Sequence, residues 1–249
     1  MALLHRAELR PSKLELLASW LPGRPWFVGA AGATVSRVAA YRFDDPAGAV
    51  GMETLLVRAG DGPVLQVPLT YRGAPLAGAD RFLIGVVEHS VLGRRWVYDA
   101  VGDPVYPPAL AAAVLADAGQ AQEYFEVDGE RQVREPSMTV TGSRTDRALP
   151  AGPADEVVDG DPTLIRAGGV ELALVRRPVP ATDVAAWSAR ILASSADVPA
   201  SSARILTSSA DVPAAEADLR VAPAEAPVAG RLTGAWPGQE AAVLLAYAR

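Results

Sequence analysis

Cysteine and asparagine are absent from this sequence of 249 residues, and lysine occurs once, at Lys13, against 22 arginines. Without cysteine the chain has no disulfide bond, no thiolate metal ligand and no cysteine nucleophile. The only histidines are His5 and His89, which excludes a metal centre built from several histidines. The missing asparagine also excludes the Asp and Asn pair of a protein-kinase catalytic loop.

Several functional motifs are missing as well. The sequence has no phosphate-binding G-x-x-x-x-G-K-[ST] loop, no G-x-G-x-x-G after a strand and no G-x-S-x-G hydrolase elbow. We therefore expect no cofactor and no metal, and the balance favours a protein that is not an enzyme. The net charge of −6 gives no basic surplus for nucleic acid. No apolar run is long enough for a signal peptide or a membrane span, so the expected location is the cytoplasm.

Half of the residues are hydrophobic, which predicts a packed globule. Ser12 and Glu15 have the spacing of a capping box, and Leu14, Leu17 and Leu21 follow at helical intervals, so a first helix is expected before Pro22 and Gly23. A second helix is expected over residues 108–118, which are rich in alanine and leucine, with Gly119 at its end. Strand-like segments separated by Gly, Pro and Asp turns fill most of the rest, at 35–43, 50–58, 63–72, 81–89, 94–100, 122–135, 137–142, 163–177 and 230–248.

The segment 63–72 alternates in a strand-like way, with Leu65, Val67 and Leu69 on one face and Gln66 and Thr70 on the other. Pro68 lacks a backbone donor, so this strand is expected at a sheet edge or with a bulge. It is also the first candidate for an exposed docking edge.

A tandem repeat interrupts the chain near its end. Residues 188–201 (SARILASSADVPAS) and 202–215 (SARILTSSADVPAA) are identical at 12 of 14 positions. The unit is shorter than the 20–45 residues typical of solenoid repeats, which favours a duplication within a linker. A repeated docking peptide anchored by Ile191 and Leu192, and again by Ile205 and Leu206, is the alternative.

These patterns predict an α+β fold with one curved, mostly antiparallel sheet and two helices. We expect a domain over residues 1–177, a flexible Ala/Ser/Pro-rich linker with the repeat over 178–229, predicted to be disordered, and a hairpin over 230–249 that returns to the domain. Helices and strands do not alternate, which argues against a parallel dinucleotide-binding sheet.

The densest polar stretch is residues 88–106. If its two strands flank one tight turn, several side chains could gather at one edge, and the candidates for ligand binding are Glu88, His89, Arg95, Trp96 and Asp99. Arg–Asp pairs that only fix the turn are the alternative. A hydrolytic triad of Ser90, His89 and Asp99 is conceivable, yet neighbours on a strand point to opposite faces.

Two further features have structural interpretations. The carboxylate pairs Asp44 with Asp45 and Asp159 with Asp161 lie at turn signals, where Asp bonds its own backbone, although clustered carboxylates also suit Mg²⁺ or Ca²⁺. Tryptophans beside helix and strand ends (Trp20, Trp26 and Trp236) are expected to pack in the core or at its margin rather than to stack on sugars.

Four segments together carry a family resemblance: YRFDDPAG, ETLLVRAGDGPVLQVPLTYRG, EHSVLGRRWVYDA with GDPVY, and LTGAWPG. They resemble the bacterial maltokinase N-terminal cap-like proteins, over roughly residues 1–177 and 230–249. The resemblance implies a cap that packs on the nucleotide-binding lobe of a sugar kinase. No kinase lobes follow the resembling segment, so independent phosphotransfer is not expected.

Two functions follow from these observations. The first is a non-catalytic accessory or regulatory module associated with a separate carbohydrate kinase of the maltose or aminosugar type, or with a second copy of itself. The alternative is a sugar- or metabolite-binding protein, or a small-glucan enzyme, that uses residues 88–106. The sequence does not identify the partner, the sugar or the oligomeric state.

Overall fold

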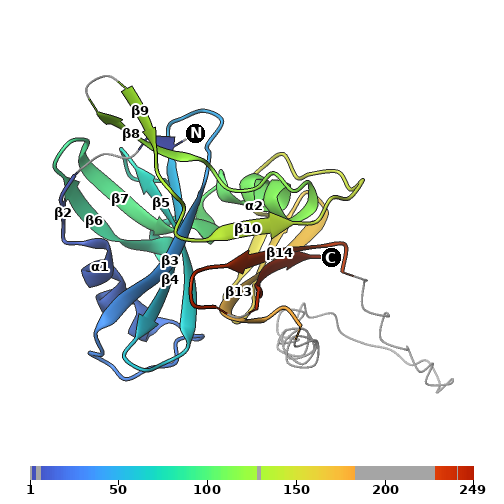
Figure 1. Ribbon diagram of the computed structural model, residues 1–249, viewed down its shortest axis with the longest axis horizontal. Helices are drawn as coiled ribbons and strands as arrows, with labels where there is room; N and C mark the ends of the chain where they lie inside the picture. Colours follow the sequence, from blue (N-terminus) through green and yellow to red (C-terminus); the bar gives the residue numbers. More distant parts are fainter. Residues whose placement is uncertain (1, 4–6, 128–129, 183–227, 240) are drawn as a thin grey trace, which may run out of the picture.

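The computed structural model describes residues 2–3, 7–127, 130–182, 228–239 and 241–249. The tandem repeat, most of the linker expected over 178–229 and the turn expected at Asp128 and Gly129 lie outside these residues. The described chain forms two six-stranded sheets beside each other, with two α-helices and a small three-stranded sheet (Figure 1).

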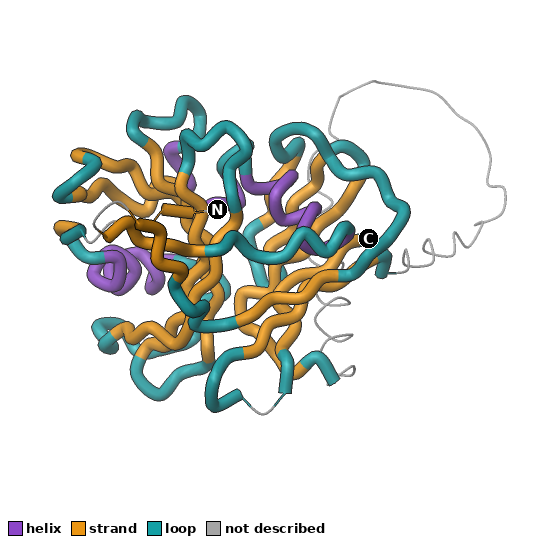
Figure 2. Tube along the Cα trace, turned by 45° about the horizontal axis from the view of Figure 1, so that its top comes forward, coloured by secondary structure: helices purple, strands orange, loops and turns teal. Residues whose placement is uncertain are grey.

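Sheet 1 is antiparallel throughout and is built from the N-terminal part of the chain. Its order is β2 (Leu9–Arg10), β6 (Leu83–His89), β7 (Gly93–Asp99), β5 (Val64–Arg72), β4 (Gly51–Ala59) and β3 (Val35–Phe43). The sheet curls into a half-barrel, and α1 (Lys13–Trp20) contacts both β3 and β6 across the opening (Figure 2). The first helix and these long strands were expected from the sequence.

Sheet 2 is also antiparallel and takes the later strands. Its order is β10 (Thr139–Gly142), β14 (Gly230–Ala235), β15 (Val243–Ala248), β13 (Val170–Pro180), β12 (Thr163–Ala167) and β11 (Glu156–Val158). The helix α2 (Tyr106–Leu115) packs on four of these strands. Because β15 lies between β13 and β14 and is antiparallel to both, the latter two run parallel.

Three short 3₁₀ turns and a small sheet complete the described fold. The 3₁₀ turns are η1 (Leu21–Gly23), η2 (Asp80–Phe82) and η3 (Ala100–Gly102). The small sheet pairs β1 (Ala2–Leu3) parallel with β8 (Glu123–Val127), which pairs antiparallel with β9 (Glu130–Val133). Its strands β8 and β9 correspond to the hairpin expected over residues 122–135.

The predicted capping box begins α1. Ser12 Oγ accepts a hydrogen bond from the Glu15 backbone at 3.3 Å, and Glu15 Oε2 accepts one from the Ser12 backbone at 2.7 Å. These two bonds satisfy amide groups that a helix start otherwise leaves unpaired. After Trp20 the chain tightens into η1 at Pro22, the expected helix end.

The strand β5 corrects two expectations. It lies in the middle of sheet 1, and residues 65–70 are all buried, so it is not an exposed docking edge. One face, with Leu65, Val67 and Leu69, packs inside the half-barrel, while Gln66 on the other face bonds to strands of sheet 2. Pro68 is tolerated because pairing with β7 begins only at the next residue.

Two sheets replace the single curved sheet that the sequence pattern predicted. The mostly antiparallel pairing and the two helices are confirmed. The strands at 230–248, however, pair with β13 and β10 in sheet 2 rather than with the first sheet. Strand periodicity predicts which residues alternate, but it contains no information on which strands become neighbours.

A close approach of backbones fixes α2 on sheet 2. A Cβ atom added at Gly142 would lie 1.8 Å from the Ala113 carbonyl oxygen. The turn after β10 also caps the helix end, because the Ser143 and Thr145 amides donate to the Val114 and Leu115 carbonyls. Only glycine allows the strand to come this close.

We expect Gly142→Ala to lower the free energy of unfolding by about 3 kcal/mol, because the added methyl group meets backbone that cannot rotate away. Gly152→Ala is the matched control, since nothing lies within 4 Å of its added Cβ. Urea unfolding followed by circular dichroism measures both. Equal midpoints for the two variants would contradict the close packing of α2.

Candidate functional site

The hairpin of β6 and β7 carries the predicted ligand-binding residues. At its exposed end Glu88 pairs with Arg94, with 2.8 Å between Oε1 and Nε. His89 Nδ1 accepts hydrogen bonds from the backbone amides of Val91 and Leu92, at 3.2 and 3.0 Å, and so closes the turn. These contacts fix the turn through a Glu–Arg pair and a histidine rather than through the Arg–Asp pairs that the alternative named.

The five predicted residues do not gather in one place. Arg95 and Asp99 point to the inner face of sheet 1, whereas Trp96 lies opposite Val86 on the outer face. Asp99 is buried at the far end of β7. The triad does not form either, because Ser90 Oγ accepts from the Glu8 backbone and Asp99 pairs with an arginine of sheet 2.

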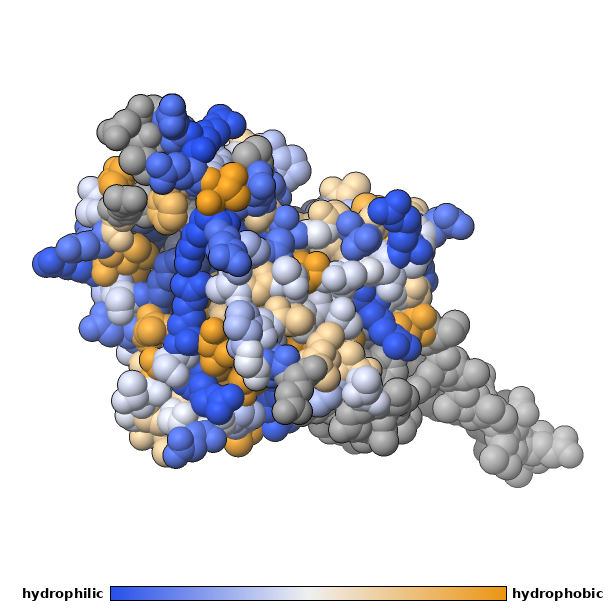
Figure 3. Space-filling model, in the orientation of Figure 1, coloured by the Kyte–Doolittle hydropathy of each residue, from blue (hydrophilic) through white to orange (hydrophobic). Residues whose placement is uncertain are grey.

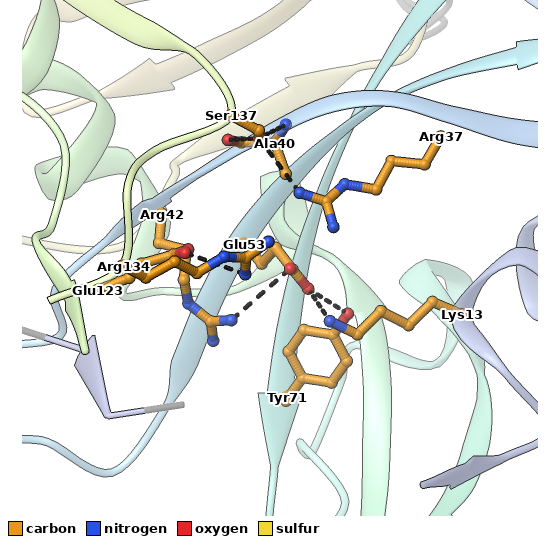
Figure 4. A network of polar contacts seen from close by, with 9 residues as sticks. All are labelled: Lys13, Arg37, Ala40, Arg42, Glu53, Tyr71, Glu123, Arg134 and Ser137. Atoms are coloured by element: carbon orange, nitrogen blue, oxygen red, sulfur yellow. Dashed lines mark hydrogen bonds and ion pairs between the residues drawn. The ribbon is translucent and has the colours of Figure 1, made fainter. Parts of the chain in front are cut away.

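A second polar group, which was not predicted, lies between α1 and the inner face of sheet 1. In this Glu53 cluster, the side chains of Lys13, Arg42 and Tyr71 converge on Glu53 of β4 (Figure 4). Lys13 Nζ donates to Glu53 Oε2, the Tyr71 hydroxyl donates to the same oxygen at 3.0 Å, and Arg42 Nη1 lies 3.6 Å from Oε1. The Glu53 side chain is only 7% exposed. The one lysine of the chain therefore fixes the start of α1 to sheet 1.

The charges of the Glu53 cluster set its protonation states. Burial alone would raise the pKa of Glu53, but the charges of Lys13 and Arg42 and two hydrogen bonds together lower it to about 2. Burial and the adjacent Glu53 charge raise the pKa of Tyr71 well above its usual value. Neither group exchanges a proton near neutral pH, so the cluster suits a structural role better than acid–base catalysis.

Figure 4 also shows how the edge of β3 is covered. Ser137 Oγ accepts a hydrogen bond from the Ala40 amide and donates one to the Ala40 carbonyl, both at 3.0 Å. Arg37 donates to the same hydroxyl at 3.1 Å. One side chain thus takes both hydrogen-bonding groups that Ala40 presents on this edge strand, which discourages pairing with another strand there.

A hollow lies between α1 and the inner face of sheet 1. Its lining is mostly apolar, from Leu16, Leu69, Val87 and neighbouring residues, with Lys13 and Tyr71 at its margin. The hollow does not admit even a water molecule, so it cannot hold a sugar while α1 stays in place. On the face shown in Figure 3, hydrophobic side chains are scattered among polar ones rather than gathered in one area.

The two sheets meet at a third polar group, the sheet junction, formed by Trp26, Asp99, Thr163 and Arg176. Arg176 of β13 is fully buried; its Nη2 lies 2.6 Å from Asp99 Oδ2 and its Nε donates to Thr163 Oγ1 at 2.8 Å. The guanidinium also stacks on the Trp26 ring, with 4.6 Å between Arg176 Cζ and the ring centroid. Burial raises the pKa of Asp99, and the Arg176 charge offsets part of that effect.

Asp45 bonds the backbone of its own turn, as the sequence predicted, whereas Asp159 and Asp161 bond partners that are distant in the sequence. Asp45 accepts hydrogen bonds from the amides of Ala47, Ala49 and Val50. Asp159 accepts from Trp26 Nε1 at 2.8 Å, and Asp161 accepts from the amides of Arg176 and Arg177. Among the described residues no group of three or more potential ligands is placed to hold a metal ion. Trp26 is buried in the core, as expected.

A family comparison identifies the first part of the chain. The model of the maltokinase N-terminal cap domain matches residues 20–103, which extend from the end of α1 through β7 to η3. Residues 20–103 belong to that family. No curated protein matches the chain. No helix in the described part of the chain is both long and apolar enough to cross a membrane.

Residues 20–103, the cap segment, thus contain most of sheet 1, with Glu53, Tyr71 and Asp99, while Lys13 and Arg176 contact this segment from outside. Sequence reasoning missed Glu53 and Arg176. The available signal was a charged residue within an apolar strand segment, in METLLV and ELALVRR. A charge in such a position is buried and needs a partner of opposite charge.

We expect Glu53→Gln to lower the free energy of unfolding by about 3 kcal/mol at pH 7. The folded pKa of about 2 lies below the ordinary value of 4.5, so the ionised carboxylate stabilises the cap segment above about pH 4.5. This contribution is lost as the pH falls toward 2, and the difference between variant and parent should shrink over that range. Urea unfolding of both proteins as a function of pH measures this difference in unfolding free energy.

The exposed Glu88 provides the control for that experiment. Glu88→Gln removes a surface ion pair and should change the unfolding free energy by less than about 1 kcal/mol at any pH. A pH-independent difference for Glu53→Gln would contradict the lowered pKa of Glu53.

Arg176→Met removes the buried guanidinium and should lower the free energy of unfolding by about 4 kcal/mol, because Asp99 is left buried without its counter-charge. Arg94→Met, which breaks an exposed ion pair, is the control and should lower the free energy of unfolding by less than about 1 kcal/mol. Thermal unfolding of both variants, with the Asp99→Asn and double variants, completes a double-mutant cycle. Additive losses in the cycle would show that Asp99 and Arg176 do not stabilise each other.

Proposed function

We propose that this chain is a non-catalytic accessory or regulatory module that associates with a separate carbohydrate kinase of the maltose or aminosugar type. The observation that supports the proposal most is the match of residues 20–103 to the maltokinase N-terminal cap domain. The family name links such a cap with a kinase. Association with a second copy of the chain is the other form of partnership, and the expected location is the cytoplasm.

The chemistry of the buried polar groups agrees with a structural module. The pKa values of Glu53 and Tyr71 are both displaced away from neutrality by their surroundings. Asp99 and Arg176 pair with each other across the two sheets. Each of these groups contributes to packing in the folded chain, which supports a structural role for them rather than the transfer of a proton or a phosphoryl group.

The alternative, a sugar- or metabolite-binding protein or a small-glucan enzyme that uses residues 88–106, has less support. A binding site requires side chains that converge on one concave surface. Arg95 and Trp96 point to opposite faces of sheet 1, and Asp99 is buried against Arg176.

A docking surface on the β6–β7 hairpin fits the proposal better than the buried strand β5. Val91 and Leu92 at the tip of the hairpin are 58% and 42% exposed, and Val86 lies on the same hairpin with 37% exposure. Apolar side chains at the centre of an interface contribute most of its stability when they are buried by a partner.

Native co-purification tests the proposal. The tagged chain should recover a sugar kinase in near-equal amount from its own cells, and the kinetics of that kinase should change when the chain is removed. Changing both Val91 and Leu92 to Asp should reduce the recovery at least tenfold. Leu149→Asp, at a side chain with 42% exposure elsewhere, is the matched control. Recovery of the chain without any kinase would contradict the proposal.

A further inference from the structure

The central strands of sheet 2 are buried on both faces. All six residues of β15, VLLAYA, are buried, and so is β13 from Leu172 to Arg176. Successive side chains of a strand point to opposite faces of its sheet. An antiparallel strand with one face in water therefore alternates between buried and exposed residues, and these two strands do not.

The two faces of sheet 2 belong to different apolar clusters. Leu172, Leu174 and Leu245 point to the face that packs on α2 and on β3 and β4 of sheet 1. The opposite face, here called the distal face, has a cluster of its own, in which every side chain is at most 3% exposed. Its members come from β12, β13 and β15: Leu164, Ala173, Val175, Leu244 and Tyr247.

The margin of the distal face is open to water, although its centre is not. Arg166 lies two residues from Leu164 and therefore on the same face. Its side chain is 41% exposed, and that of its partner Glu156 is 54% exposed. Arg166 also pairs with Glu171. An apolar centre that excludes water, beside a polar and accessible margin, is the arrangement of a surface in contact with a partner.

The path of the chain leads over the distal face. Val179, just before residues 183–227, and Val228, directly after them, both pack against the distal cluster. The strand β13 ends at Pro180 beside the start of β15, whereas β14 begins at Gly230 beside the end of β15. The connection must therefore pass along the length of β15, and α2 and sheet 1 already occupy the other face.

We propose that the distal face is the docking site of residues 183–227 of the same chain, which bind it through Trp187, Ile191 and Leu192. Trp187 is the only aromatic residue of that segment, and Ile191 with Leu192 forms the apolar pair of the first repeat. Large apolar side chains gain most from burial against such a surface. Because both ends of the segment are held at this face, its effective concentration there exceeds that of a separate partner.

The absence of cysteine allows a direct test with single thiols in the full chain. Ala173→Cys places a thiol on the distal face and Ala246→Cys places one on the opposite face, both at positions that are 0% exposed. In the purified chain both thiols should react slowly with a maleimide. Changing Trp187, Ile191 and Leu192 together to Ser should raise the rate at Ala173→Cys at least about tenfold and leave Ala246→Cys nearly unchanged.

The second repeat supplies the matched control, because its apolar pair has the same sequence. Ile205→Ser with Leu206→Ser should leave the labelling of Ala173→Cys unchanged. Rapid labelling of Ala173→Cys in the otherwise unchanged chain would overturn the proposal, as would an equal effect of the two repeats. Protection that grows with protein concentration would also overturn it, because a second copy would then cover the face.

A fluorescence measurement does not require the docked segment to be disrupted. The difference in emission between the parent protein and Trp187→Phe reports on Trp187 alone. Acrylamide should quench this emission much more slowly in the native chain than in urea, because the docked indole is shielded from solvent. Equal quenching in the two conditions would refute the proposal, even if the triple serine variant unfolds and exposes both thiols.

Discussion

One buried arginine holds the two halves of this molecule in a fixed relation. Arg176 enters from sheet 2, pairs with Asp99 at the end of a strand of sheet 1 and stacks on Trp26 beside η1. A guanidinium removed from water requires such partners on several sides, and its planar shape allows an ion pair and a ring contact at once. Together with the hydrogen bonds of Gln66 and the apolar core between the sheets, these contacts hold sheet 2 on the half-barrel, which buries β5 on both faces.

The Glu53 cluster performs a similar task on the inner face of the half-barrel, where Glu53 and Asp99 flank Leu69 of β5. There Lys13 ties the first turn of α1 to β4, and α1 in turn covers the opening between β3 and β6. The buried charged side chains thus lie where one element packs against another. An apolar side chain in such a position would stabilise the contact without fixing its geometry. Ion pairs with defined geometry fix the angle at which a helix or a sheet approaches.

Local signals in the sequence predicted the elements well and their assembly poorly. The capping box at Ser12 and Glu15, the Pro22 stop and the glycine turns mark helix and strand ends by short-range chemistry. The three-residue strand β11 was missed because it lies in a polar stretch that reads as a loop. The partners Asp99 and Arg176 are 77 residues apart, and no local pattern connects them. Because adjacent residues of a strand point to opposite faces of its sheet, the sequence alone places Arg95 and Trp96 on opposite faces. This placement argues against a pocket that both residues line.

The parallel relation of β13 and β14 sets a minimum length for the segment that joins them. The chain leaves β13 at Pro180 beside Val243 and begins β14 at Gly230 beside Ala248, so it must travel back along the length of β15. A crossover of this kind needs about a dozen residues, and 49 residues separate the two strands. Each doubling of a loop changes its closure free energy by only about 0.6 kcal/mol. Loss of one 14-residue unit would therefore still leave more residues than this crossover requires.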